Sequence, residues 1–301
     1  MKAVVLTAYG DVDKLELREM PDPRAGSGAI VVRMAGASIN PVDWKMRSGQ
    51  ARARFPVEFP GILGRDASGR VVEVGKGVNA FAMGDRVLGL VTGAYAELVA
   101  APAEAWAKIP TGLDLAEAGA LPLVLLTGVQ LIDAIEPTER DTVLVTGAAG
   151  SVGRAAVFAA KERGARVWAG VRASQRAEGA TVGADAVVAL DDDADLAKLP
   201  VFDAIGDTVG GDVIKKLFAR VKAGGVLGST VGEPVGARER GLVVRAFMAH
   251  PDSAMLAKYA AAVAERKLTI PIAMKLPLAS AAEGQTLAEK KHPGGKVLLL
   301  G

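Results

Sequence analysis

Three glycines spaced three residues apart are the clearest sign of chemistry in the sequence. Gly147, Gly150 and Gly153 follow an apolar run at 142–145 and precede a stretch with helical spacing. Glycines at such a turn let the backbone approach a pyrophosphate, and the amides that begin the helix face its negative charge. The alternative is a glycine-rich turn that binds no dinucleotide. We predict that a dinucleotide contacts Gly147, Ala148, Ala149, Gly150, Ser151, Val152 and Gly153.

The residues after the next apolar run, 166–171, distinguish between the two nicotinamide dinucleotides. An NAD-binding protein would carry Asp or Glu there for the ribose hydroxyls, whereas this chain carries Arg172, with Ser174 and Arg176 close behind. Arginine forms charge-assisted hydrogen bonds with a 2′-phosphate, which a carboxylate would repel. The sequence therefore favours NADPH over NADH. The alternative is that both arginines are solvated residues of a loop and a first helical turn.

The elements around these residues predict an α/β fold. After a helical stretch at 115–135, apolar runs alternate with helical stretches, as in a doubly wound parallel sheet of the Rossmann type. The predicted strands are 142–145, 166–171, 186–190, 202–205 and 225–228, and the predicted helices are 152–163, 174–182 and 213–221.

The residues on either side of this alternation predict a second, β-rich domain. Short apolar runs separated by turn residues come before it, and a helix and an apolar tail follow it. We expect the last strand to return to the first domain, which gives a β-rich domain of 1–115 and 268–301 and a nucleotide-binding domain of 116–267. The predicted strands are 3–6, 30–34, 68–74, 85–90 and 94–100, the helix is 253–267, and the tail segments are 270–274, 278–290 and 296–300.

Composition excludes several classes of function. Among 301 residues there is no cysteine, and the only histidines are His250 and His292, so we predict no disulfide, no thiolate nucleophile and no metal. The net charge of +2 comes without a basic block, which argues against nucleic acid as a partner. No apolar run is long enough to span a bilayer, so we expect no membrane segment and a soluble cytoplasmic protein.

Short motifs along the whole chain resemble one family. The chain resembles the quinone oxidoreductase branch, which includes zeta-crystallin, of the zinc-independent medium-chain dehydrogenase/reductase superfamily. The order and spacing of the motifs are more specific than any one of them. They lie at 1–6, 37–45, 64–69, 72–75, 84–87, 93–97, 120–122, 126–128, 207–211 and 295–297.

The resemblance implies a chaperonin-10-like β domain beside the Rossmann domain, with the cofactor between them, and a homodimer. Zinc-dependent relatives carry His and Glu after the glycine that corresponds to Gly64, whereas this chain has Arg65 and Asp66. It also lacks the cysteines of the zinc sites. The stretch between Val87 and Tyr95 is short for the family, which implies a more open wall of the substrate cleft.

The resemblance also implies site residues beyond the glycine turn. Asn40 and Lys45 are expected near the nicotinamide as the catalytic pair, and Asn40 is expected to bind the cofactor as well. Lys45 would face the developing oxyanion or donate a proton. The structural alternatives are a turn residue for Asn40, a solvated helix residue for Lys45, a helix or packing residue for Thr127 and a core residue for Phe247. Further cofactor contacts are expected from Thr127, Asp207, Thr208, Val209, Ser229, Val231, Gly232, Phe247 and Lys296.

Three functions are compatible with these residues. The first is transfer of hydride from NADPH to a quinone. The second is reduction of an alkenal or alkenone, because both acceptors need a hydride near an electron-poor carbon and a stabilised oxyanion. The third is an NADPH-binding sensor with little turnover, which the glycine turn does not distinguish from an enzyme. Asn40 and Lys45 favour an enzyme.

Overall fold

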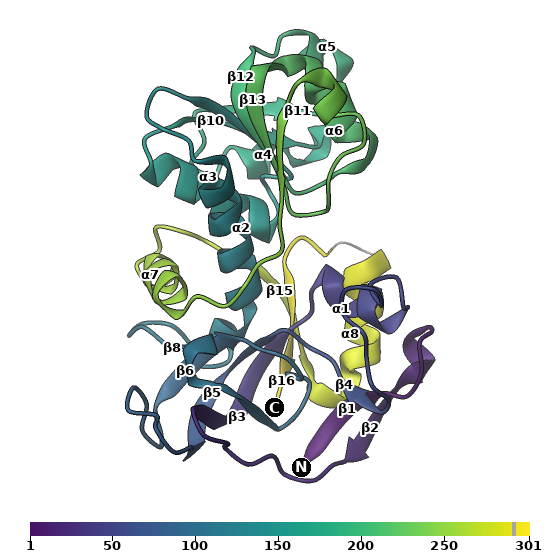
Figure 1. Cartoon of the computed structure of the whole chain (residues 1–301), viewed down its shortest axis with the longest axis vertical. Coiled ribbons are helices and arrows are strands. Elements are labelled where there is room, and N and C mark those ends of the chain that lie inside the picture. Colours follow the sequence, from purple (N-terminus) through teal and green to yellow (C-terminus); the bar gives the residue numbers. More distant parts are fainter. Residues whose placement is uncertain (291–292) are drawn as a thin grey trace. The chain divides into compact units, whose positions relative to one another are not determined.

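The computed structural model describes residues 1–290 and 293–301, so His292 lies outside the described part of the chain. The chain divides into two compact units. The first comprises Met1–Leu123 with Pro251–Gly301, and the second comprises Val124–His250. Both termini belong to the first unit (Figure 1).

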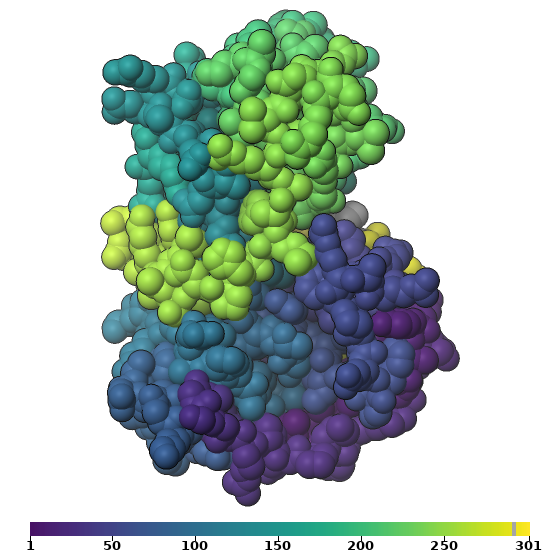
Figure 2. Space-filling model, viewed as in Figure 1, coloured from purple at the N-terminus to yellow at the C-terminus, as the bar shows by residue number. Residues whose placement is uncertain are grey.

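Residues 251–267, expected with the nucleotide-binding domain, fold with the first unit, because helix α7 (Ser253–Ala264) packs on the short strand β8 (Trp106–Lys108). The yellow-green surface of α7 rests on the blue surface of this region in Figure 2.

The second unit is built on a six-stranded sheet in which every pair of neighbours is parallel. The strand order is β11-β10-β9-β12-β13-β14. Counted from β9, this is the order 3-2-1-4-5-6 of doubly wound dinucleotide-binding domains, and it confirms the predicted fold class. The strands are β9 (Thr142–Thr146), β10 (Arg166–Val171), β11 (Ala186–Ala189), β12 (Phe202–Asp207), β13 (Val221–Ser229) and β14 (Val243–Ala246).

Helices connect these strands, as the alternating pattern predicted. The sequence placed α3 and β10 within a residue or two of their bounds, but it missed β14 and made α4 too long. Tight backbone packing joins α2 to α3, because a Cβ on Gly128 would lie 2.5 Å from the Val152 carbonyl oxygen. The helices are α2 (Pro122–Ile135), α3 (Ser151–Glu162), α4 (Arg176–Gly179), α5 (Asp193–Ala197) and α6 (Gly211–Leu217).

The first unit contains a seven-stranded sheet and a three-stranded sheet. Its larger sheet runs β15-β16-β3-β5-β6-β8, with β7 also paired to β3. Strand β16 is antiparallel to β3, so the tail returns to this unit as predicted. The strands are β1 (Lys2–Leu6), β2 (Leu15–Glu19), β3 (Ala29–Ser38), β4 (Gly61–Ile62), β5 (Asp66–Val74), β6 (Arg86–Leu90), β7 (Leu98–Pro102), β15 (Ile272–Pro277) and β16 (Lys296–Leu300), and the remaining helices are α1 (Pro41–Arg47) and α8 (Ala281–Lys290).

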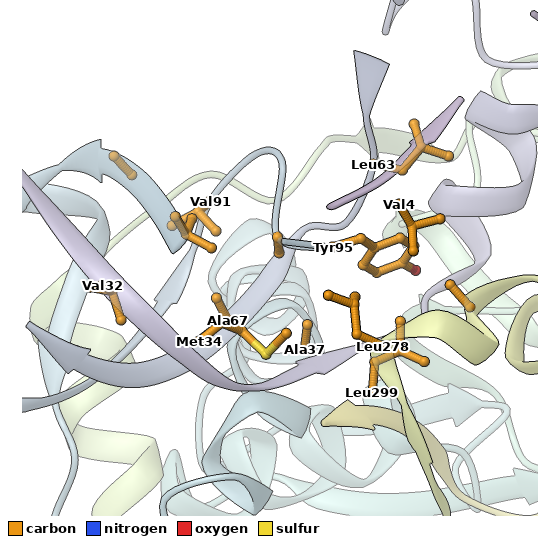
Figure 3. Packing of buried hydrophobic residues seen from close by; sticks show 14 of the residues in the cluster. Val4, Val32, Met34, Ala37, Leu63, Ala67, Val91, Tyr95, Leu278 and Leu299 are labelled. Atoms are coloured by element: carbon orange, nitrogen blue, oxygen red, sulfur yellow. The ribbon is translucent and has the colours of Figure 1, made fainter. Parts of the chain in front are cut away.

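The core of the first unit surrounds one aromatic side chain. Tyr95 is fully buried, and Figure 3 shows its ring among Val4, Leu63 and Leu278. The backbone of Tyr95 bonds to Val4 on one side and Leu63 on the other, so the chain here links two segments instead of continuing a strand. This explains why the strand predicted at 94–100 begins only at Leu98.

Candidate functional site

The glycine turn, residues 147–153, connects β9 to α3 in a shape that larger residues would prevent. Gly147 has a φ of +63°, and a Cβ there would lie 2.5 Å from the hydroxyl of Thr208. A Cβ on Gly153 would lie 2.2 Å from the carbonyl oxygen of Gly147. The first glycine is therefore needed for the backbone conformation, and the last lets the helix pack against the turn.

The start of α3 offers unpaired amides at this turn. Its N-cap is Gly150, which has no side chain to accept a hydrogen bond. Gly150 itself donates to Gly147, whereas the amides of Ser151, Val152 and Gly153 have no acceptor within the described residues. Such amides, together with the helix dipole, form a site for a phosphate group. This geometry fits the pyrophosphate of a dinucleotide.

The turn lies where the strand order of the sheet reverses. β9 and β12 are neighbours at this point, and Asp207 ends β12. The buried carboxylate of Asp207 accepts hydrogen bonds from the Thr146 hydroxyl at 2.7 Å and from the amides of Val209 and Gly210. The Ser229 hydroxyl, at the end of β13, also donates to it. Asp207 thus fixes the ends of three strands, and it shapes the ligand crevice expected at such a reversal.

Three more predicted residues gather at this edge of the sheet. Val209, Val231 and Gly232 line a hollow of about 350 Å³ in the second unit. Both valines are about half exposed, and the amide of Val231 donates to Ser229. The hollow therefore presents an apolar wall next to the glycine turn, because a Cβ on Gly147 would also touch Val209. An apolar wall beside phosphate-binding amides suits the rings of a dinucleotide.

The two arginines after β10 differ in their partners. Arg172 and Ser174 are exposed, and the Arg172 side chain forms no hydrogen bond or ion pair within the part of the chain that the structure describes. Arg176 donates to Asp195 at 2.5 Å and lies 3.6 Å from Asp192. Of these two arginines, Arg172 is the one whose guanidinium has no carboxylate bound to it among the described residues.

In the first unit, a buried polar cluster forms around Asn40. We call Ser38, Asn40, Asp66 and Lys296 the Asn40 cluster; all four are at most 6% exposed. The ammonium of Lys296 donates to the Asn40 side-chain oxygen at 2.5 Å, and the Asn40 amide donates to Asp66 at 2.8 Å. Ser38 also donates to Asp66. Burial lowers the pKa of Lys296, although the carboxylate of Asp66 acts in the opposite direction.

A second buried carboxyl group lies beside this cluster. Asp43 accepts hydrogen bonds from the backbone N–H of Asn40 at 2.8 Å and from the Tyr95 hydroxyl at 3.0 Å, both through Oδ2. Its Oδ1 atom has no hydrogen-bond partner among the residues that the structure describes. Burial raises the pKa of Asp43 to about 7, because desolvation of the carboxylate outweighs these two hydrogen bonds. Burial also raises the pKa of Tyr95 well above its usual value.

The remaining predicted residues lie apart from these two groups. Lys45 is exposed on α1, and its side chain has no ion pair among the described residues. Thr127 is half-buried on α2, and Phe247 is half-buried just after β14, where its amide bonds to Ser229. The structure thus gathers Gly147–Gly153, Thr208, Val209 and the residues after β13 in the second unit, and Asn40 with Lys296 in the first. The sequence did not predict Arg154, Asp43 or Tyr95 as part of either group.

The described residues do not gather metal ligands. Within 1–290 and 293–301, no group of three or more His, Cys, Asp or Glu side chains lies close enough together to hold a metal ion. Asp66 has both carboxylate oxygens occupied, one by Ser38 and Asn40 and the other by the amide of Leu123. No helix in the same part of the chain has the length and apolar character needed to cross a membrane.

Two family models match the chain. The alcohol dehydrogenase GroES-like domain matches residues 26–111, and the zinc-binding dehydrogenase model matches residues 182–299. These ranges fall mainly on the β-rich part and on the nucleotide-binding part with the tail.

Relatives and a solved structure agree with these models. A chloroplast envelope quinone oxidoreductase homolog of Arabidopsis thaliana is 35% identical over 62% of this chain, which spans 60% of the length of that relative. Acryloyl-coenzyme A reductase of Metallosphaera sedula is 27% identical over 99% of both chains. A mycobacterial protein solved in complex with NADPH superimposes with a TM-score of 0.85, at 28% identity over the whole of both chains. With the fold and the glycine turn, these matches show that the chain belongs to the medium-chain dehydrogenase/reductase superfamily of oxidoreductases and is similar to its quinone oxidoreductases.

Proposed function

We propose that this protein is a zinc-independent oxidoreductase that uses NADPH to reduce a quinone. The observation that carries the proposal is the glycine turn, whose unpaired amides at Ser151, Val152 and Gly153 lie where the strand order reverses. The NADPH named for the mycobacterial structure supports the choice of cofactor, and the quinone oxidoreductase named for the Arabidopsis relative supports the choice of acceptor.

Three parts of the second unit would hold the cofactor. The amides that begin α3 would bind the pyrophosphate, and Arg172 would bind the 2′-phosphate through charge-assisted hydrogen bonds. The apolar wall at Val209 and Val231 would contact the rings. When bound, NADPH supplies the hydride, and the protein positions the acceptor and stabilises the charge that develops on its oxygen.

Lys45 is the residue that we propose for charge stabilisation. Its ammonium is exposed and free of carboxylates in the described chain, so it can approach an acceptor oxygen. Asn40 has both ends of its side-chain amide engaged, by Lys296 and Asp66. We therefore propose that Asn40 serves the reaction mainly by fixing the backbone where α1 begins, because its side chain is buried and its backbone N–H donates to Asp43.

Zinc independence is supported by the composition and by Asp66. The sequence has no cysteine, and Asp66 accepts three hydrogen bonds from its own unit. A homodimer and a cytoplasmic location are part of the same proposal. They rest on the family resemblance and on the composition.

A second acceptor class has its own support. The reductase from Metallosphaera sedula, whose name specifies an acryloyl thioester, matches this chain along almost all of both lengths. Reduction of an α,β-unsaturated carbonyl compound is therefore the alternative activity. It requires the same cofactor and the same stabilisation of an oxyanion.

Oxidation of NADPH by the purified protein tests the proposal. A quinone and an alkenal are offered in parallel assays, each with and without a chelator. We expect turnover with the quinone, unchanged by the chelator, and a loss of about tenfold in kcat/KM for Lys45→Met. Lys76→Met, which removes an exposed lysine from a glycine-rich turn, is the matched control and should leave the rate unchanged. Faster turnover with the alkenal would favour the alternative, and loss of activity with the chelator would refute zinc independence.

A further inference from the structure

One cation of the second unit lies beneath the glycine turn and has no role in the function proposed so far. Arg154 belongs to the first turns of α3 and is only 6% exposed. A buried guanidinium is rare unless its donors are satisfied. Its position in the sequence, one residue after Gly153, gave no indication that it contacts the turn.

The Arg154 side chain reaches back to the turn itself. Its Nε atom donates to the carbonyl oxygen of Ala149 at 2.9 Å, and the guanidinium donates to Glu178 on α4 at 2.8 Å. The side chain of Glu178 is one-third exposed, whereas that of Arg154 is 7% exposed. The arginine is thus held between the centre of the turn and the helix that follows β10.

The contact between Arg154 and Ala149 helps to keep the first amides of α3 without a hydrogen-bond acceptor. Ala149 lies four residues before Gly153, so its carbonyl is the acceptor that a helix extended by one residue would use. In the structure that oxygen is bound by Arg154, and the amide of Gly153 forms no bond to it. The bond therefore stabilises a helix that begins at Ser151, with its first amides available to an anion.

Charge adds to this geometric effect. A cation packed under the turn raises the positive potential at the amides that would face a pyrophosphate. The hydrogen bond to Glu178 holds the guanidinium in place while its Nε atom contacts the turn. The free amides and the positive potential both favour binding of the pyrophosphate. NADPH and NADH share this group, so Arg154 should affect the binding of both.

We propose that Arg154 is a positioning residue for the pyrophosphate, held in place by Glu178. This inference rests on the proposed binding of a nicotinamide dinucleotide at the glycine turn. In this role Arg154 acts on cofactor binding through the backbone of the glycine turn and does not touch the cofactor itself.

The test compares dissociation constants for NADPH and NADH, measured by titration calorimetry at a temperature where melting curves show each variant to be folded. Arg154→Met keeps the length of the side chain and removes its donors. We expect it to raise both constants by about tenfold, to raise the KM for the cofactor and to leave kcat unchanged. Arg154→Lys keeps the charge but lacks the planar, spaced donors of a guanidinium, so it should recover only part of the affinity.

Two further variants separate positioning from general stability. Glu178→Gln keeps an acceptor but loses the charge, and we expect it to raise both constants by about threefold. Lys161→Met removes another cation of α3, which pairs with Asp185 away from the turn, and should change neither constant. Hydrogen exchange without cofactor should be faster at residues 149–153 in Arg154→Met and unchanged in Lys161→Met.

Each outcome decides between the two proposals. If folded Arg154→Met binds both cofactors within twofold of the native protein, the role of Arg154 is refuted while the proposed function stands. If only NADPH binding is weakened, Arg154 acts on the 2′-phosphate and the inference is also wrong. If the native protein binds neither cofactor, both proposals are refuted.

Discussion

The guanidinium of Arg176 donates a hydrogen bond to the carboxylate of Asp195, and so the second of the two arginines predicted to bind a 2′-phosphate is already paired. Asp192 lies 3.6 Å from the same guanidinium. Asp195 is fixed in turn by the amide of Ala189. Binding of a phosphate by Arg176 would have to compete with these carboxylates, whereas Arg172 has no such competitor in the described chain.

Arg172→Ala is therefore expected to reduce NADPH binding more than Arg176→Ala. A hydrogen bond between charged groups contributes about 1.5–3 kcal/mol, so the dissociation constant for NADPH should rise by at least about tenfold in Arg172→Ala. The constant for NADH should stay within about twofold. Titration of both cofactors measures this difference. An equal loss for NADPH and NADH in Arg172→Ala would refute the assignment of the 2′-phosphate.

Gly153→Ala should disrupt the turn. The added Cβ would lie 2.2 Å from the Gly147 carbonyl oxygen and 2.6 Å from the Ala148 Cα, both of them backbone atoms that cannot rotate away. We expect a loss of about 1–3 kcal/mol in the free energy of unfolding and weaker binding of both cofactors. Gly150→Ala, with a nearest contact of 3.2 Å, is the matched variant and should have the smaller effect in urea denaturation and in titration. Equal effects of the two substitutions would contradict this account.

Asp43 should make stability depend on pH near neutrality. Its pKa of about 7 in the folded protein lies above the unfolded value of 3.8, so the folded state holds an extra proton between these two values. The free energy of unfolding should fall as the pH rises from about 4 to about 7, by at most about 1.4 kcal/mol per pH unit, and then level off.

Urea denaturation at pH 5, 6, 7 and 8 measures this slope. Asp43→Asn cannot ionise, yet it keeps an oxygen that accepts from the Tyr95 hydroxyl and the backbone N–H of Asn40, so its slope should be flatter than that of the native protein. Asp212→Asn, which removes an exposed carboxylate, serves as the control with an unchanged slope. Parallel curves for the native protein and Asp43→Asn would rule out this role for Asp43.

Lys296→Met should destabilise the first unit. The substitution removes the donor to the Asn40 oxygen and the cation 3.9 Å from Asp66, and it leaves a buried carboxylate without its positive partner. Breaking a buried pair on one side costs about 3–5 kcal/mol. Lys275→Met breaks an exposed pair with Glu117 and should cost less than about 1 kcal/mol in the same urea denaturation assay. A small effect at Lys296 would show that the Asn40 cluster contributes little to stability.

The sequence predicted those parts of the fold that follow from local patterns. The run 166–171 and the tail strand 296–300 match β10 and β16, because continuous apolar residues between turn signals are typical of buried strands. β14 was missed because it has only four residues and Arg245 interrupts its apolar run. The helix predicted at 174–182 is shorter in the structure, where α4 ends at Gly179.

Partners in the site could not be predicted in the same way. The glycine turn is a local motif, so its position was evident from spacing alone. The bond between Arg176 and Asp195 joins residues 19 apart, and the bond between Lys296 and Asn40 joins residues 256 apart. Both contacts arise from the order of strands in the two sheets, which no local pattern specifies. Arg154 was missed for a related reason, because its long side chain folds back onto the preceding turn.

The central place of β16 in the first unit has a consequence for how the protein is made. This strand lies between β15 and β3, yet it is translated after all the other strands of both units. The second unit is one continuous segment, so all of its strands have been synthesised before β16 exists. During translation the nucleotide-binding unit can therefore fold first. The edge of β3 that pairs with β16 must wait until residues 296–300 have left the ribosome, and in that interval it is open to chaperones or to pairing with another chain.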